Sequence, residues 1–326
     1  MGVIPAMGGL HHVTAIAGDP RGNLRFYREV LGLRLVKRTV NFDDPGTYHL
    51  YYGDALGRPG TLLTFFPWPG ARPGQVGAGQ VAVTAFTIPE ASIGYWQERL
   101  RTRGVTVEGI APRFEEEEVV LRFRDPDGLA LELVAHPRAE ERPGWPDGPV
   151  PPEHAIRGLH GVTLLEAMAE PTLRFLIEGM GFQVEREEGD RIRLRVGPGG
   201  PGAWVDLRID PRASRGRVAV GTVHHVAWRV RNDAEQGAWR THLQARGLYV
   251  TPVMDRKYFR SIYFREPGGV LFEIATDPPG FAIDEPPERL GTGLMLPDWL
   301  EPRRSEIEQA LPPLEVPGEP PSVNPT

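Results

Sequence analysis

Hydrophobic and polar positions follow one order four times along the chain. Each repeat starts with an apolar stretch that alternates like a strand and continues with a segment whose apolar residues recur every three or four positions. It ends in short apolar stretches around a proline–glycine turn. In the first repeat, Leu24, Phe26, Tyr27 and Leu31 would share one helix face. The pattern predicts an α+β fold of four βαβββ modules, in which curved mixed sheets carry their helices outside.

Proline-rich segments predict how the modules are grouped. Residues 137–152 hold six prolines in sixteen positions, a composition typical of an extended connector. A short amphipathic helix is expected at 302–311, and the tail after it has little to bury. The glutamate run at 115–118 predicts a solvated hairpin or turn. The expected boundaries are 1–136 and 158–285 for two tandem halves of two modules each, 137–157 for a proline-rich linker, and 286–326 for a C-terminal helix and tail.

Composition excludes several classes of function. The 326 residues contain no cysteine, which excludes a disulfide scaffold, a catalytic thiol and any cysteine-bound metal or iron–sulfur cluster. A metal would therefore be bound by histidine and carboxylate. The 37 basic and 43 acidic residues give a net charge of −6, so nucleic acid is not an expected partner. Since no membrane span or secretory signal is evident, we expect a cytoplasmic protein with no membrane partner. We also expect it to be a homo-oligomer.

Alignment of the four modules identifies candidate metal ligands. Two equivalent positions are informative: the first strand holds His12, Val83, Gly161 and His225, and the last strand holds Phe65, Glu132, Leu207 and Glu273. Among these, His12, His225 and Glu273 would form a 2-His-1-carboxylate triad, which is typical of Fe(II) sites that react with dioxygen, with Mn(II) as the nearest substitute. The first and fourth modules would then have to pack side by side. Glu132 is left out, because neither its own module nor the third has a histidine at the equivalent first-strand position. An arginine salt bridge would satisfy its charge as well as a metal would.

These motifs resemble the vicinal oxygen chelate superfamily over nearly the whole chain. The segments GLHHVTAI, EHAIRGLHGVTL and DRKYFRSIYFREPGGVLFEIATD are together similar to those of ring-cleaving dioxygenases that act on para-hydroquinones. The resemblance implies an extradiol-type dioxygenase that binds Fe(II), or Mn(II), through His12, His225 and Glu273 and uses a small aromatic diol and dioxygen. It also implies that five residues surround the open coordination positions: His11, Thr14, His224, Arg256 and Tyr263.

Strand geometry supports some of these positions. Alternate residues of a strand share a face, so Thr14 should point the same way as His12. If Pro267–Gly269 forms a three-residue hairpin loop, Tyr263 lies opposite Glu273 on the same face. The same alternation turns the first histidine of each pair away from the metal, unless the strand begins with a twist or bend.

Some alternatives stay open at this point. The DRKYFRSIY segment looks shorter than in the chlorohydroquinone enzymes, so Arg256, Lys257 and Arg260 are all candidates for the basic residue of the site. A catechol-type diol fits the sequence as well as a hydroquinone. A glyoxalase-like isomerase is a further possibility, although Phe65 stands where its additional carboxylate ligand would be expected. A non-catalytic protein that binds quinones or antibiotics is the third.

Overall fold

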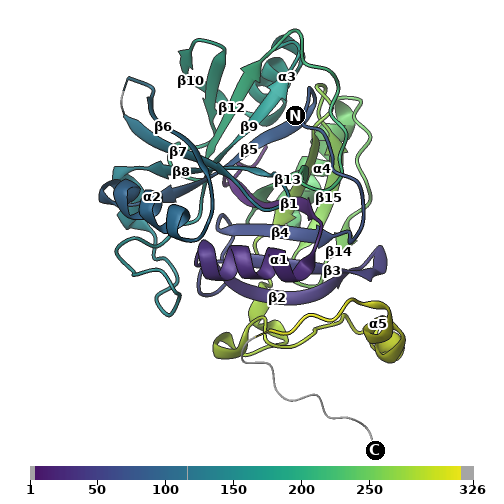
Figure 1. The fold of residues 1–326 in the computed structure, drawn as a ribbon. Coiled ribbons are helices and arrows are strands. Elements are labelled where there is room, and N and C mark those ends of the chain that lie inside the picture. Colours follow the sequence, from purple (N-terminus) through teal and green to yellow (C-terminus); the bar gives the residue numbers. More distant parts are fainter. Residues whose placement is uncertain (1–3, 116, 317–326) are drawn as a thin grey trace, which may run out of the picture.

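The computed structural model describes residues 4–115 and 117–316 and contains the four predicted modules in order (Figure 1). The first comprises β1 (Leu10–Ala17), α1 (Pro20–Arg25) with a π-helical turn (Phe26–Val30), β2 (Arg34–Asn41), β3 (Asp44–Gly53) and β4 (Leu62–Pro67). The second comprises β5 (Gln80–Ile88), α2 (Ile93–Thr102), β6 (Val107–Arg113), β7 (Glu118–Arg124) and β8 (Ala130–Ala135).

The second half of the chain repeats this arrangement. The third module comprises β9 (Leu159–Glu166), α3 (Glu170–Arg174) with a π-helical turn (Phe175–Gly179), β10 (Gln183–Glu188), β11 (Arg191–Arg195) and β12 (Trp204–Ile209). The fourth comprises β13 (Val223–Val230), α4 (Asp233–Ala245), β14 (Met254–Asp255), β15 (Arg260–Arg265) and β16 (Leu271–Thr276). The short helix predicted near the C-terminus is α5 (Arg304–Ala310), while the end of the predicted tail, from 317 on, lies outside the described residues.

The modules combine across the two halves into two eight-stranded mixed sheets. The first sheet has the order β14-β15-β16-β13-β1-β4-β3-β2 and joins the first module to the fourth. The second has the order β10-β11-β12-β9-β5-β8-β7-β6 and joins the second module to the third. Antiparallel pairing of β1 with β13 places strands from the beginning and end of the chain side by side (Figure 1). The predicted packing of the first module against the fourth is confirmed.

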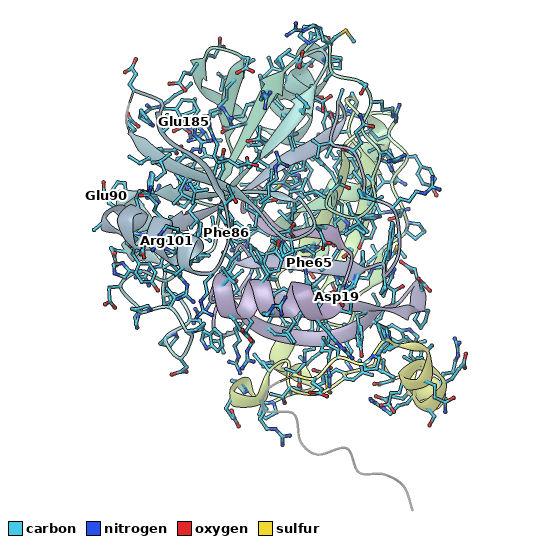
Figure 2. All side chains as sticks on the ribbon, viewed as in Figure 1. Asp19, Phe65, Phe86, Glu90, Arg101 and Glu185 are labelled. Atoms are coloured by element: carbon cyan, nitrogen blue, oxygen red, sulfur yellow. The ribbon has the colours of Figure 1, made fainter. Side chains whose placement is uncertain are left out.

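Helices cover the outer faces of the sheets because their apolar stripes have no other surface on which to be buried. Phe65 of β4 and Phe86 of β5 are fully buried, whereas Arg101 on the outer face of α2 is exposed (Figure 2). Asp19 starts α1 directly after β1, since its carboxylate accepts the backbone N–H groups of Arg21 and Gly22. Within the described residues, none of the helices combines the length and the apolar character needed to cross a membrane.

Two local expectations were only partly right, although the glutamate run does lie at the β6–β7 hairpin turn with Glu115 and Glu117 exposed. The connector is not extended throughout, because Pro137–Glu141 forms a 3-10 helix that begins where the His136 side chain accepts the backbone N–H of Arg138. The glutamate run is not a solvated turn at its end. Glu118 opens β7 and is buried, where it forms ion pairs with Arg113 and Arg193.

Candidate metal centre

Three buried side chains from separate strands meet on the inner face of the first sheet. His12 comes from β1, His225 from β13 and Glu273 from β16. The Nε2 atoms of the two histidines are 3.3 Å apart, and Glu273 Oε2 lies 3.3 Å from His12 Nε2 and 2.9 Å from His225 Nε2. One ligand atom from each residue thus lies within 4.8 Å of the others, a spacing suited to a shared metal ion.

The electrostatics of this cluster fit a divalent cation. Burial by itself raises the pKa of Glu273, but the contacts with His12 and His225 outweigh it and hold the pKa well below its usual value. The buried Glu273 Oε2 has the Nε2 atoms of His12 and His225 as close neighbours, but no well-formed hydrogen bond to them or to other described residues. A buried anionic oxygen without a donor is costly, and a metal ion would remove this cost. Imidazole and carboxylate donors without sulfur suit a divalent transition-metal ion.

Strand pairing explains why the ligands converge. Ala227 of β13 pairs with His12 on one side and with Glu273 on the other. His225 lies two residues earlier on β13, on the same face of the sheet as Ala227, and pairs with Thr14. The β1–β13 ladder shifts its register between Leu10 and His12. His11 lies in this irregularity, and a second shift, between Thr14 and Ala15, leaves His224 out of the pairing. Strict alternation is therefore broken at the first histidine of each pair.

The first histidine of each pair contacts the second. His11 Nδ1 lies 2.9 Å from His12 Nδ1, and His224 Nδ1 lies 2.8 Å from His225 Nδ1. Burial, followed by the neighbouring ligand histidine, lowers the pKa of His11 well below its usual value and that of His224 to about 3. Both rings are therefore neutral at neutral pH. His224 lines the cavity next to the cluster, whereas His11 is not part of that lining among the described residues.

A cavity of about 390 Å³ opens onto the cluster and has an aromatic wall. Its aromatic lining consists of Phe42, Tyr51, Phe66, Trp68, Phe259 and Tyr263, in addition to histidines. Tyr263 pairs with Glu273 across the β15–β16 ladder, as hairpin counting predicted, and its ring centroid lies 5.7 Å from that of His225. Burial and the nearby Glu273 charge raise the pKa of Tyr263, so its hydroxyl stays protonated.

The structure distinguishes the three basic candidates. Arg256 lines the cavity, donates from Nε to the Tyr263 hydroxyl at 3.2 Å and forms an ion pair with Asp43. The pKa of Arg256 is lowered by burial, but Tyr263 and Asp43 outweigh this and raise it. Lys257 instead donates to the carbonyl of Leu296, and Arg260 forms an exposed ion pair on α4.

Thr14 shares a face with His12 but does not line the cavity among the described residues. Its hydroxyl contacts Thr64 at 2.8 Å, and Thr64 contacts His49 Nε2 at 2.9 Å. His49 in turn contacts the Tyr51 hydroxyl at 2.8 Å, and both residues line the cavity. His49 and Tyr51 were not among the residues predicted for the site, although their alternation on one strand places them on the same face.

The second sheet has the same strand pairings without the metal ligands. Ala85 of β5 pairs with Gly161 and Glu132, as Ala227 pairs with His12 and Glu273. Glu132 is thus the counterpart of Glu273, and it is held by Arg113 at 2.9 Å and Arg122 at 3.2 Å, the arginine pairing considered from the sequence.

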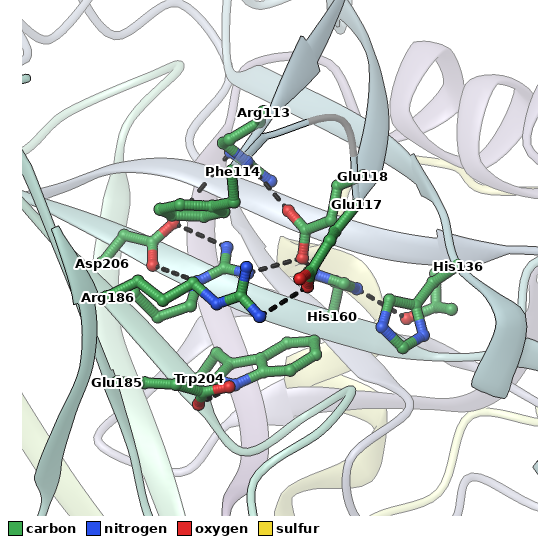
Figure 3. Close-up of polar contacts among 12 residues, drawn as sticks. Arg113, Phe114, Glu117, Glu118, His136, His160, Glu185, Arg186, Trp204 and Asp206 are labelled. Atoms are coloured by element: carbon green, nitrogen blue, oxygen red, sulfur yellow. Dashed lines mark hydrogen bonds and ion pairs between the residues drawn. The ribbon is translucent and has the colours of Figure 1, made fainter. Parts of the chain in front are cut away.

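Arginine and carboxylate side chains fill the centre of the second sheet (Figure 3). The guanidinium of Arg193 donates to Asp206 and Glu118 and lies over the rings of Phe114 and Trp204. Ion pairs and aromatic side chains thus fill the second sheet at the position where the first sheet has its histidine cluster.

Comparison with known proteins identifies the family. The model of the Glyoxalase/Bleomycin resistance protein/Dioxygenase superfamily matches residues 9–133 and 158–274. The chain belongs to this superfamily. It is 50% identical to "Putative ring-cleaving dioxygenase MhqO" of Bacillus subtilis, over 94% of this chain and 97% of that protein. It is 36% identical to "Chlorohydroquinone/hydroquinone 1,2-dioxygenase" of Sphingobium indicum, over 92% and 94% respectively.

A solved structure agrees with this assignment. The crystal structure of a "putative dioxygenase" from Bacillus subtilis superposes with a TM-score of 0.90 at 48% identity, covering 96% of this chain and 99% of that one. Membership of the superfamily confirms the fold expected from the sequence. The names of these relatives support a dioxygenase role for the chain.

Proposed function

We propose that this chain is a non-haem Fe(II) ring-cleaving dioxygenase that acts on a hydroquinone-type aromatic diol with dioxygen. The proposal rests on one observation: the buried side chains of His12, His225 and Glu273 lie together beside a cavity with aromatic walls. The relative named chlorohydroquinone/hydroquinone 1,2-dioxygenase supports this substrate class. Bound to these residues, Fe(II) would favour the deprotonated form of a substrate hydroxyl and react with dioxygen, and Mn(II) is the alternative metal.

The cavity wall would orient the substrate ring. Phe42, Phe66, Trp68 and Phe259 line the cavity with apolar ring faces and edges. Aromatic side chains bind a planar ring by offset or edge-to-face contacts and exclude water from it. We infer that the ring lies among these side chains, with one hydroxyl directed at the histidine–glutamate cluster.

Tyr263 and Arg256 would stabilise negative charge on the reacting oxygen atoms. The guanidinium of Arg256 donates to the Tyr263 oxygen, so the phenolic proton is free to be donated elsewhere. Because the pKa of Tyr263 is raised, its hydroxyl remains a donor throughout the neutral range. A fixed donor next to a cation, in a site shielded from water, is suited to stabilising charge that develops during the reaction.

The Nδ1–Nδ1 contact within each His-His pair assigns a role to the first histidine of that pair. His225 can offer the lone pair of Nε2 to a metal only if its proton is on Nδ1, and this proton is then donated to His224 Nδ1. The proton of neutral His224 is then on Nε2, and we propose that His224 donates it to the bound substrate or oxygen. By the same argument His11 fixes the tautomer of His12 from behind the cavity wall.

Oxygen consumption provides the test of the proposal. Anaerobic loading with Fe(II), followed by hydroquinone and air, should consume one dioxygen per ring cleaved and remove the aromatic absorbance. Catechol in a parallel reaction tests the alternative diol. Isomerisation of a substrate without oxygen uptake would contradict the proposal. The predicted alignment was wrong at Phe65: Thr14 pairs with Thr64 as Ala227 pairs with Glu273, so Thr64 holds the equivalent position, while the buried Phe65 ring packs 4.5 Å from that of Tyr27. Thr64 weighs against the glyoxalase-like outcome, since it provides no further carboxylate. The alignment was wrong in the third module as well, where Asp206, not Leu207, holds this position.

A further inference from the structure

Glu132 and Glu273 occupy equivalent positions of the second and fourth modules and are held in different ways. In the second sheet, Glu132 has Arg113 on Oε2 and Arg122 on Oε1, so both oxygens are bound by guanidinium groups. In the first sheet, Glu273 Oε1 accepts a hydrogen bond of 2.5 Å from the hydroxyl of Ser261. Its other oxygen, Oε2, faces the two ligand histidines.

Ser261 belongs to the sheet that carries the histidine cluster and has no hydroxyl counterpart in the other sheet. It lies on β15 and pairs with Ala275, two residues from Glu273 on β16. Val120 of β7 pairs with Val134 of β8 and is its counterpart in the second sheet. Ser261 and Glu273 are both fully buried, so water does not compete for this hydrogen bond. The hydroxyl is therefore placed at one specific oxygen of one specific carboxylate.

We propose that Ser261 is a positioning residue that keeps Glu273 a one-oxygen ligand of the metal. Carboxylates bind metals through one oxygen or through both. To bind through both, Glu273 would have to turn Oε1 towards the metal and give up its bond to Ser261. Binding through one oxygen leaves one more coordination position open. This inference rests on the proposed function, since substrate and dioxygen need open positions at the same metal.

The test compares the number of exchangeable water molecules on Mn(II) bound to Ser261→Ala and to the wild-type protein. Water-proton relaxation measures this number. Ser261→Ala should lose one exchangeable water, because Glu273 then binds through both oxygens. A crystal structure of the Mn(II)-loaded variant would show the second Glu273 oxygen at the metal directly. Ser261→Thr, which retains a hydroxyl, should restore the water count. Ser92→Ala, at another fully buried serine that contacts His154, is the matched control and should leave the count unchanged.

The outcomes separate this inference from the proposed function. An unchanged water count in Ser261→Ala, with Glu273 still bound through one oxygen, overturns the role of Ser261 whatever the enzymatic rate. If Ser261→Ala does not fold, Ser261→Cys, which is nearly isosteric and a weak donor, takes its place with the same expected loss of one water. If wild-type protein binds Mn(II) through one Glu273 oxygen but loaded protein cleaves no ring, the proposed function fails and the positioning role remains.

Discussion

Tyr263 lies directly opposite Glu273 on neighbouring strands, and its hydroxyl accepts a hydrogen bond from Arg256. The tyrosine is thus next to the proposed metal centre of His12, His225 and Glu273 without belonging to that cluster. We predict that Tyr263→Phe retains the metal and lowers kcat by about 100-fold, a typical cost of removing one donor to developing oxygen charge. Steady-state oxygen uptake, with metal content measured on the same samples, would show this.

Tyr249→Phe is the matched control, because Tyr249 is 83% exposed and lies outside the cavity lining. It should turn over as the wild type does. Unchanged turnover in Tyr263→Phe as well would leave Tyr263 with a role in packing alone.

His225 provides the clearest test of the ligand set. His225→Ala should weaken Fe(II) binding by more than about 100-fold, since even changes to residues behind the ligands often cost 10–100-fold in affinity. Equilibrium dialysis followed by elemental analysis would measure the loss. His242→Ala, on α4 where His242 contacts the carbonyl of Gly179, should bind Fe(II) normally. Full iron occupancy in His225→Ala would remove this residue from the ligand set.

Local sequence patterns were sufficient to predict the modules and one contact between neighbouring strands of a hairpin. Periodicity and proline–glycine turns are properties of neighbouring residues, so they are visible in a single chain. Counting across the Pro267–Gly269 loop placed Tyr263 opposite Glu273 because a hairpin fixes its own register. The same counting places Ser261 diagonally next to Glu273, and it would have revealed this serine as a neighbour of the centre.

Other features depend on partners that no local pattern specifies. His49 acts together with Thr64 and Tyr51, and its place at the cavity follows from the way β3 and β4 join the sheet. Glu118 was expected in solvent because it ends an acidic run. It is buried because Arg113 and Arg193 come from other strands to neutralise it. Arg113 lies opposite Glu118 in the β6–β7 hairpin, but Arg193 reaches Glu118 only when β11 joins the same sheet, so the sequence shows the charge without this partner.

The charge network of the second sheet should contribute strongly to stability. Arg193→Met would leave the buried carboxylates Asp206 and Glu118 without one of their cations (Figure 3). Removing one partner of a buried ion pair typically costs about 3–5 kcal/mol. Urea denaturation would measure this cost as a lower free energy of unfolding, with metal binding by the folded protein unchanged.

The exposed pair of Arg186 and Glu117 gives a control in the same region (Figure 3). Arg186→Met should cost less than about 1 kcal/mol, because ion pairs near the surface contribute little. Equal losses in Arg186→Met and Arg193→Met would contradict a special role for the buried network.

Two neighbouring carboxyl groups, Glu166 and Glu266, predict how the free energy of unfolding depends on pH. Glu166 at the end of β9 is buried against the Glu266–Gly269 hairpin, and its Oε1 has no hydrogen-bond partner among the described residues. Burial and the nearby charge of Glu266 raise the pKa of Glu166 to about 8. Glu266 itself accepts hydrogen bonds from Thr172 and two backbone N–H groups. Glu166 is therefore mainly protonated in the folded protein at neutral pH.

Whether the protein gains or loses stability as the pH rises depends on which state, folded or unfolded, binds more protons. Unfolded Glu166 releases its proton near pH 4.5, whereas the folded protein holds it up to about pH 8. The folded state thus binds more protons in this window, and the free energy of unfolding should fall as the pH rises from about 5 to 8. Allowing for solvent screening, we expect the contribution to be on the order of 1–3 kcal/mol.

Glu166→Gln should flatten this part of the urea-denaturation profile, while Glu153→Gln, at an exposed position, should retain it. A profile for Glu166→Gln as steep as that of the wild type would show that another group causes the dependence.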